Sequence, residues 1–250
     1  MKSKFFKDEV LEGQRKPNMI ERLGFGTDPD AGKYLRLEME NFKQVDFRYP
    51  AKLVWCGTSL SGGSLDEAEV SRQTRFQVKK VKAFTVTFEN AKKRPELNAL
   101  SVLQEQITDE SLVVVECGVN DVTNIFDESE NMDRLASIDS KMRELVSINA
   151  FLKKKHKLER VILLQRIPRL DEKSQLSHFS NQAMLRAVVE NTDPHGIIVR
   201  TLHLSGSKES LFGVPGVRNT KGQFPDGLHL RGLNGRVAFT EAAIEMLRSC

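Results

Sequence analysis

Cysteine is scarce in this sequence: its 250 residues include three, Cys56, Cys117 and Cys250. Their spacing matches neither a metal-ligand motif nor a disulfide framework, which favours a reducing compartment. We interpret Cys56 and Cys117 as small buried apolar residues, close to each other in space, and not as a redox pair.

Long apolar runs are also missing. No stretch approaches the roughly 20 apolar residues that a membrane-spanning helix requires. The first eight residues, Met-Lys-Ser-Lys-Phe-Phe-Lys-Asp, lack the apolar segment of a secretory signal. These two absences predict a protein located in the cytoplasm or elsewhere inside the cell.

The charge balance excludes little. The 38 basic and 34 acidic residues leave a formal net charge of +4, a mild excess that does not by itself indicate nucleic-acid binding. With 39% hydrophobic and 29% charged residues, the composition suits one α/β domain with an ordinary core, alone or with a short extension. Residues 1–49 are charged and weakly patterned, and we expect a partly ordered extension there. Pro50 marks the boundary of a domain that spans residues 50–250.

Segments typical of strands and helices alternate about five times after residue 50. The predicted strands are Lys52–Cys56, Val81–Phe88, Leu112–Val115, Val161–Leu164 and Ile197–Val199. The predicted helices are Ser64–Gln73, which starts with a capping box, Pro95–Thr108, Met132–Leu152, Gln175–Val189 and Gly235–Leu247. This alternation predicts a parallel sheet with helices on both faces. Ligands of such sheets bind beyond the carboxyl ends of the strands.

Four polar residues are predicted at that edge. Ser59 follows the first strand, Asn120 follows the third, and Asp226 and His229 precede the last helix. A turn over Asp226-Gly-Leu-His229 can bring the carboxylate to the imidazole, which leaves the other ring nitrogen as a base. A serine hydroxyl needs such a base in order to attack. The side-chain amide of Asn120 and the backbone N–H of Ser59 suit a developing oxyanion.

Each of these signals has an ordinary structural alternative. A serine after a strand and a glycine is usually a loop residue. An isolated Asp-x-x-His is more often a surface loop or a helix cap, and Asn120-Asp121 can cap the turn that follows. The order and placement of the three segments together favour a catalytic site.

The same three segments resemble the sequence blocks of the SGNH/GDSL hydrolase superfamily. Gly57-Thr-Ser-Leu60 is similar to the first block, Gly118-Val-Asn-Asp121 to the third, and Asp226-Gly-Leu-His229 to the fifth. The resemblance covers about residues 50–250. It implies a flavodoxin-like three-layer α/β/α sandwich around a five-stranded parallel sheet of order 2-1-3-4-5. It also implies hydrolysis of a small-molecule, lipid or carbohydrate ester, without metal or cofactor.

By position in these blocks, the resemblance makes Ser59 the nucleophile, His229 the base and Asp226 the residue that orients it. Asn120 and the N–H of Ser59 become the oxyanion donors. Two departures stand out: Thr58 occupies the aspartate position of the first block, and the glycine of the second block is missing. No glycine lies between Gly63 and Gly118. A backbone N–H of Glu89, Asn90 or Ala91 can substitute for it, and the sequence does not place the donor.

A different class of function remains open. Lys153-Lys-Lys-His-Lys157 is most simply a solvated helix end, but it can also contact phosphates. The alternative hypothesis is therefore an SGNH-like module with little or no activity that binds nucleic acid or a protein partner. The retained Ser59, Asp226 and His229 argue against it. We interpret Arg166 and Arg169 as surface ion-pairing residues, with contact to an acidic substrate as the alternative.

Overall fold

The computed structural model describes residues 51–108, 111–116, 118, 120–122, 131–158, 160–167, 175–191, 196–218, 222–223 and 225–249. The predicted extension, Pro50, Cys117, Arg169 and Cys250 lie outside these residues. Within them, no helix is both long and apolar enough to cross a membrane.

The described chain forms a five-stranded sheet in the order β2-β1-β3-β4-β5. The strands are β1 (Ala51–Gly57), β2 (Phe76–Lys82), β3 (Ser111–Glu116), β4 (Val161–Leu164) and β5 (Ile197–Arg200). All four neighbouring pairs are parallel. The expected sheet and its strand order are therefore confirmed, and the carboxyl ends of the five strands meet at one edge.

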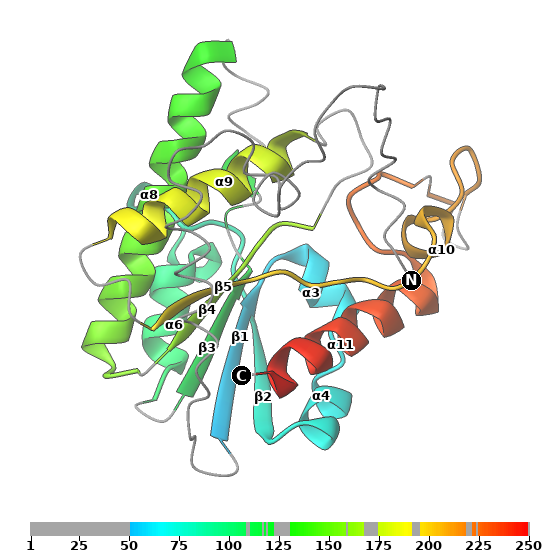
Figure 1. Cartoon of the computed structure of the whole chain (residues 1–250), viewed down its shortest axis with the longest axis horizontal. Coiled ribbons are helices and arrows are strands. Elements are labelled where there is room, and N and C mark those ends of the chain that lie inside the picture. The colour runs from blue at the N-terminus through cyan, green and yellow to red at the C-terminus, as the bar shows by residue number, and fades with distance from the viewer. Residues whose placement is uncertain are drawn as a thin grey trace, which may run out of the picture.

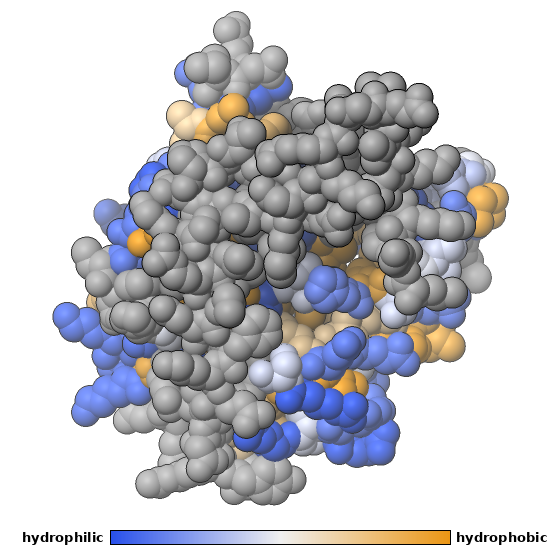
Figure 2. All heavy atoms as spheres, viewed as in Figure 1, coloured by the Kyte–Doolittle hydropathy of each residue, from blue (hydrophilic) through white to orange (hydrophobic). Residues whose placement is uncertain are grey.

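Helices cover both faces of this sheet, so the fold is the expected three-layer α/β/α sandwich (Figure 1). One layer holds α6 (Ala99–Gln106), α8 (Asn131–Lys155) and α9 (Gln175–Glu190). The other layer holds α4 (Glu67–Gln73) and α11 (Gly232–Arg248), with the short α3 (Ser59–Ser64) beside them. Hydrophilic residues gather on the outer surface over α4 and the adjoining part of α11 (Figure 2).

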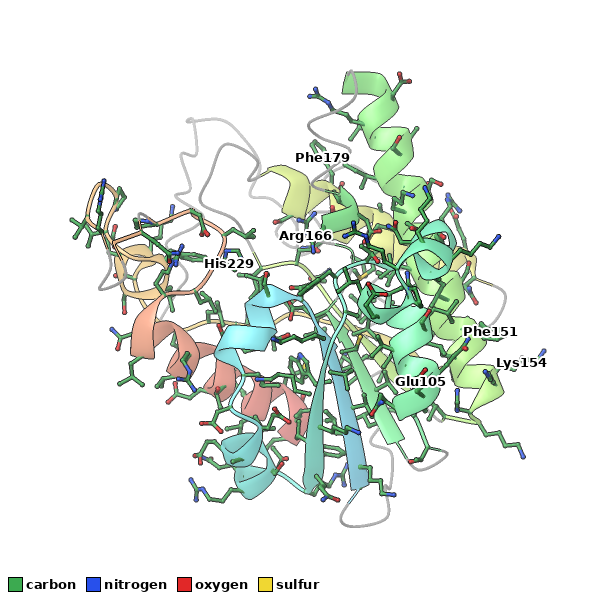
Figure 3. The ribbon with its side chains drawn as sticks, turned by 180° about the vertical axis from the view of Figure 1, so that it is seen from behind. Glu105, Phe151, Lys154, Arg166, Phe179 and His229 are labelled. Carbon is green, nitrogen blue, oxygen red and sulfur yellow. The ribbon has the colours of Figure 1, made fainter. Side chains whose placement is uncertain are left out.

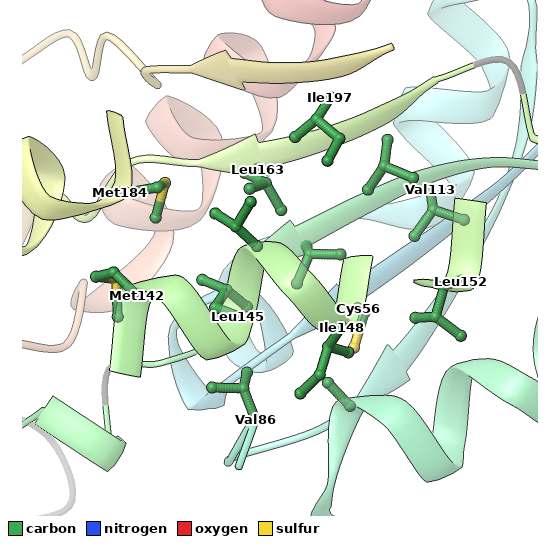
Figure 4. Close-up of a cluster of buried hydrophobic side chains, with 14 of the residues drawn as sticks. Cys56, Val86, Val113, Met142, Leu145, Ile148, Leu152, Leu163, Met184 and Ile197 are labelled. Atoms are coloured by element: carbon green, nitrogen blue, oxygen red, sulfur yellow. The ribbon is translucent and has the colours of Figure 1, made fainter. Parts of the chain in front are cut away.

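Strand β1, which lies between β2 and β3, has buried side chains on both faces, as a parallel strand between two helical layers requires. Val54 and Cys56 belong to the cluster against α6, α8 and α9, which Figure 4 shows in close-up. Leu53 and Trp55 belong to the cluster against α11, where Trp55 meets the Phe239 ring edge-on at 6.0 Å. The Cys56 side chain is buried, as expected for an apolar packing residue.

Three sequence predictions between residues 64 and 108 are wrong. The second strand is β2, Phe76–Lys82, and not residues 81–88, where Thr87 instead caps α5 (Phe88–Lys93) with its side chain. Ser64 ends α3, and Asp66 is the side chain that caps α4. The helix predicted over residues 95–108 is a 3-10 turn, η1 (Pro95–Leu97), followed by α6, because Asn98 starts a new helix with its own cap.

The later elements follow the prediction closely, with ends that differ by a few residues. The apolar residues that recur along one face of α8 and of α11 were expected to be buried, and all are buried except Leu135 and Val237, which are 46% and 44% exposed. The expected residues are Leu135, Ile138, Met142, Leu145, Ile148 and Leu152 in α8, and Val237, Ala238, Ala242, Ile244 and Leu247 in α11. A short helix, α10 (Lys208–Phe212), lies between β5 and α11 and packs Leu211 and Phe212 against Ala238. Helix α10 thereby supports the segment before α11, and that segment contains Asp226 and His229.

Candidate active site

Ser59 lies where β1 meets α3. β1 ends at Gly57, and Thr58 caps the helix by accepting a hydrogen bond from the backbone N–H of Leu60 at 3.3 Å. Ser59 is thus the first residue of α3, and its side chain is exposed. The strand-to-helix junction presents the hydroxyl at the carboxyl edge of the sheet.

Gly57 makes this junction possible. A Cβ atom at residue 57 would lie 1.7 Å from Oγ of Ser61 and 3.0 Å from Oε2 of Glu116. No side chain can occupy that space while Ser61 stays in place. The glycine therefore lets α3 fold back closely over the end of β1, which fixes the position from which Ser59 projects.

Asp226 and His229 form a turn that closes on itself. Gly227 has a φ of +65°, a left-handed conformation that favours glycine. Oδ1 of Asp226 accepts the backbone N–H groups of Leu228 at 3.0 Å and His229 at 2.8 Å. Oδ2 lies 2.7 Å from Nδ1 of the His229 ring. This Asx-type turn aligns the carboxylate with the imidazole before any substrate binds.

The two segments meet at the edge of the sheet. Oγ of Ser59 lies 2.8 Å from Nε2 of His229, although 170 residues separate them. With Nδ1–H donating to Asp226, Nε2 is left to accept the serine hydroxyl hydrogen. The side chains of His229 and Asp226 are 36% and 41% exposed, so a substrate can reach them. Serine, imidazole and carboxylate form one continuous hydrogen-bonded chain.

Asp226 stays ionised over the whole physiological range. Partial burial raises the pKa of its carboxyl, but the donated bonds of His229 and Leu228 outweigh this effect and lower the pKa to about 2. Arg231 adds a further contact, with its Nη2 atom 3.1 Å from Oδ2. Sequence reasoning missed Arg231, which the Asx-type turn brings back to the carboxylate.

Asn120 and Asp121, from the segment after β3, hold the loop that follows β2. Nδ2 of Asn120 donates to the backbone carbonyl of Phe84 at 3.1 Å, and the buried carboxylate of Asp121 accepts the N–H of Val86 at 3.1 Å. Burial raises the pKa of Asp121, and the bond from Val86 opposes that rise. Asn120 and Asp121 therefore brace this loop, and one N–H of the Asn120 amide is used for that purpose.

Two of the three expected substitutes for the missing glycine are occupied. The N–H of Asn90 donates to the Thr87 hydroxyl at 3.2 Å, and that of Ala91 donates to the Thr87 carbonyl at 3.0 Å. Both bonds belong to the first turn of α5. The N–H groups of Asn90 and Ala91 are therefore used within α5, whose start the sequence prediction had assigned to a strand.

Glu116 is a buried carboxylate directly behind the serine junction, and sequence reasoning did not single it out. It ends β3, in register with Gly57. Oε1 accepts the Thr58 hydroxyl at 3.0 Å, and Oε2 accepts the Ser61 N–H at 3.2 Å. Burial raises the pKa of Glu116 to about 7 against the opposing effect of these bonds. An acidic residue at the end of the apolar run 112–115 was the available signal.

Arg166 is buried and not a surface residue, so its interpretation as a surface ion-pairing side chain is wrong. It is 5% exposed, and its Nη1 donates to Oγ of Ser180 at 3.1 Å. The segment after β4 turns it inward, because Asn181 bonds both backbone groups of Arg166. A pocket at the carboxyl edge of the sheet is lined by Leu60, Glu116, Leu164, Gln165, Arg166, Ile167 and Leu202.

The lysine cluster lies elsewhere. Lys153, Lys154 and Lys155 form the last turn of α8, and the Lys155 ammonium lies 5.8 Å from the centre of the exposed Phe151 ring. Figure 3 shows Phe151 and Lys154 well away from Arg166 and His229. Among the described residues, no group of three or more His, Cys, Asp or Glu side chains is placed to hold a metal ion.

No family model and no curated protein matches the chain. Solved structures with a similar backbone include an alpha/beta hydrolase enzyme from the metagenome of Lake Arreo, Spain. That structure has 16% identity and a TM-score of 0.49, over 81% of this chain and 97% of that one. An acetylxylan esterase from Geobacillus stearothermophilus has 16% identity and a TM-score of 0.46, over 81% and 96%. A lipase from a goat rumen metagenome has 13% identity and a TM-score of 0.48, over 80% and 96%.

Proposed function

We propose that this protein is a serine ester hydrolase of the SGNH type, with Ser59, His229 and Asp226 as its catalytic triad. The observation that carries the proposal is the hydrogen-bonded chain from Ser59 Oγ to His229 Nε2 at 2.8 Å and from His229 Nδ1 to Asp226 Oδ2 at 2.7 Å. Neither a loop serine nor a surface Asp-x-x-His turn requires a contact between residues that are 170 positions apart in the sequence. A serine nucleophile does require contact with its base, wherever that base lies in the sequence.

In the acylation step, Oγ of Ser59 attacks the ester carbonyl carbon while Nε2 of His229 takes the hydroxyl proton. The carbonyl oxygen becomes an oxyanion, and the negative charge of Asp226 stabilises the imidazolium. Collapse of the intermediate breaks the bond to the alcohol, which leaves with the proton from His229. A water molecule, activated by the same base, then releases the acid and restores Ser59.

The oxyanion donors we assign are the backbone N–H of Ser59 and the second N–H of the Asn120 amide, whose first N–H donates to Phe84. Such donors act because they point at the charge before it forms, and one donor typically contributes about 2.7–4 kcal/mol to lowering the barrier. The substrates we propose are small-molecule, lipid or carbohydrate esters, including acetyl esters. None of these steps uses a metal or a cofactor.

A fluorophosphonate probe tests this proposal, together with hydrolysis of p-nitrophenyl acetate and longer acyl esters. We expect wild-type protein to be labelled, Ser59→Ala to lose both labelling and hydrolysis, and Ser205→Ala, which alters another exposed serine, to keep both. Folded wild-type protein that neither reacts nor hydrolyses any ester contradicts the proposal. Nucleic-acid binding that weakens steeply with salt in such unreactive protein would favour the binding-module hypothesis.

A further inference from the structure

Glu116 contacts the nucleophile junction at two points that flank Ser59. One carboxylate oxygen accepts the hydroxyl of Thr58, the residue before Ser59, at 3.0 Å. The other accepts the backbone N–H of Ser61, two residues after it, at 3.2 Å. A single side chain therefore holds both ends of the four-residue segment 58–61, which contains the serine.

The environment of these contacts is closed. Glu116, Thr58 and Ser61 are 6%, 1% and 0% exposed. A buried carboxylate must be held by donors, because an uncompensated charge in the interior is costly. The sheet register places Glu116 beside Gly57, and the absence of a side chain at residue 57 leaves room for the carboxylate and Ser61 to meet. The arrangement is thus specified by three elements, β1, β3 and α3.

We propose that Glu116 is a positioning residue for the nucleophile, which fixes the Ser59 hydroxyl against His229 by holding Thr58 and Ser61 on either side of it. Glu116 does not touch the substrate and takes no proton in the reaction. The inference rests on the proposed hydrolase function. Its physical basis is that a displacement of about 1 Å between reacting groups can lower the rate about 100-fold.

The opposite end of α3 provides a matched control. The Thr240 hydroxyl donates to the carbonyl of Ser64 at 3.1 Å and accepts the N–H of Asp66 at 3.1 Å. Thr240 is buried like Thr58. Thr240→Val therefore removes a buried tether of the same short helix without touching the turn that holds Ser59.

The experiment compares wild type, Glu116→Ala, Glu116→Gln, Thr58→Val and Thr240→Val. We expect kcat to fall about 10- to 100-fold in Glu116→Ala with KM changed less than about twofold, since the orientation of the serine and not substrate binding is affected. Glu116→Gln keeps the shape and part of the bonding, so its loss should be smaller. Thr240→Val should stay within about twofold of wild type.

A double variant tests the route of the effect. If Glu116 acts through Thr58, the kcat losses of Thr58→Val and Glu116→Gln should not multiply in the combined variant, because the two changes break one linked set of contacts. Losses that multiply fully would contradict this route. If Glu116→Ala fails to fold, Glu116→Gln and Thr58→Val decide the question.

Crystal structures of wild type, Thr58→Val and Glu116→Gln separate this inference from the function on which it rests. We expect the contact between Ser59 Oγ and His229 Nε2 to lengthen in both variants relative to wild type. Unreactive wild-type protein refutes the hydrolase, whereas the displacement of Ser59 can still be measured. Variants that retain the wild-type contact and kcat, or an equal loss in Thr240→Val, overturn the positioning role.

Discussion

The buried carboxyl of Glu116 should leave a measurable imprint on how stability depends on pH. Its pKa rises from 4.5 to about 7 on folding, chiefly through burial. Between these two values the folded protein holds a proton that the unfolded chain has released. Stability therefore decreases as pH rises through this window, by about 1.4 kcal/mol per pH unit, which amounts to about 3 kcal/mol in total.

The change that isolates this contribution is Glu116→Gln, because the amide has nearly the same shape and does not titrate. The free energy of unfolding of both proteins is measured by urea denaturation from pH 4.5 to 8. Asp121, whose pKa is also raised, contributes equally to both curves and cancels in their difference. We expect Glu116→Gln to gain stability relative to wild type as pH rises, by up to about 3 kcal/mol near pH 7 and above.

The constant difference in unfolding free energy between the two proteins does not test the prediction, since glutamine also changes the hydrogen bonds to Thr58 and Ser61. The slope of the difference is the test. A difference in unfolding free energy that is constant from pH 4.5 to 8 would show that the carboxyl of Glu116 titrates alike in the folded and unfolded chain. The account of its burial would then be refuted.

Three further changes have expected outcomes. Gly57→Ala should abolish esterase activity and lower the thermal midpoint in a melting experiment, because its methyl group would overlap Oγ of Ser61. Asp226→Asn should reduce kcat about 10⁴-fold in ester hydrolysis, because the amide cannot stabilise the His229 imidazolium; an unchanged kcat would exclude the triad. Ile162→Val, in the buried middle of β4, should cost about 1 kcal/mol in urea denaturation and leave KM unchanged.

The sequence predicts the apolar strands of this sheet, including the edge strand β5, better than the mixed edge strand β2. β1, β3, β4 and β5 are apolar runs, because strands covered on both faces need hydrophobic side chains throughout, and such runs are visible without a structure. β2 is an edge strand with a mixed burial pattern, and four of its seven residues are lysine or glutamine. The β-branched stretch that follows it, residues 83–87, looked more like a strand but forms the loop that Asn120 and Asp121 hold.

Some residues of the candidate site could be predicted from the sequence and others could not. Ser59, Asn120, Asp226 and His229 were predicted because each belongs to a short segment with recognisable spacing. Glu116 was not predicted, because its contacts with the serine junction depend on strand register. The register places Glu116 beside Gly57, although 59 positions separate them in the sequence. An acidic residue at the end of an apolar run is visible in the sequence, but a single sequence contains no pattern that reports its lateral contact with Gly57. The same limit concealed the inward turn of Arg166.

Strand register also gives the threonine at position 58 a role, at the place where the first SGNH/GDSL block that this segment resembles has aspartate. The Thr58 hydroxyl donates to Oε1 of Glu116 in a fully buried site. An aspartate there would place a second carboxylate against the first, and two buried like charges cannot both ionise without a large cost. Threonine supplies a donor where aspartate would supply an acceptor, so residues 58 and 116 form one matched pair.

This pairing predicts the behaviour of the substitution Thr58→Asp. Thr58→Asp should destabilise the protein by about 3 kcal/mol at pH 8, where both carboxyls would be ionised, and less at pH 5, where protonation relieves the repulsion. Combining it with Glu116→Gln should recover most of the loss at pH 8, since the glutamine amide can donate to the new carboxylate. Urea denaturation of the two single variants and the double variant measures this coupling. If Thr58→Asp is equally destabilising with glutamate or glutamine at position 116, the two residues do not act as a pair.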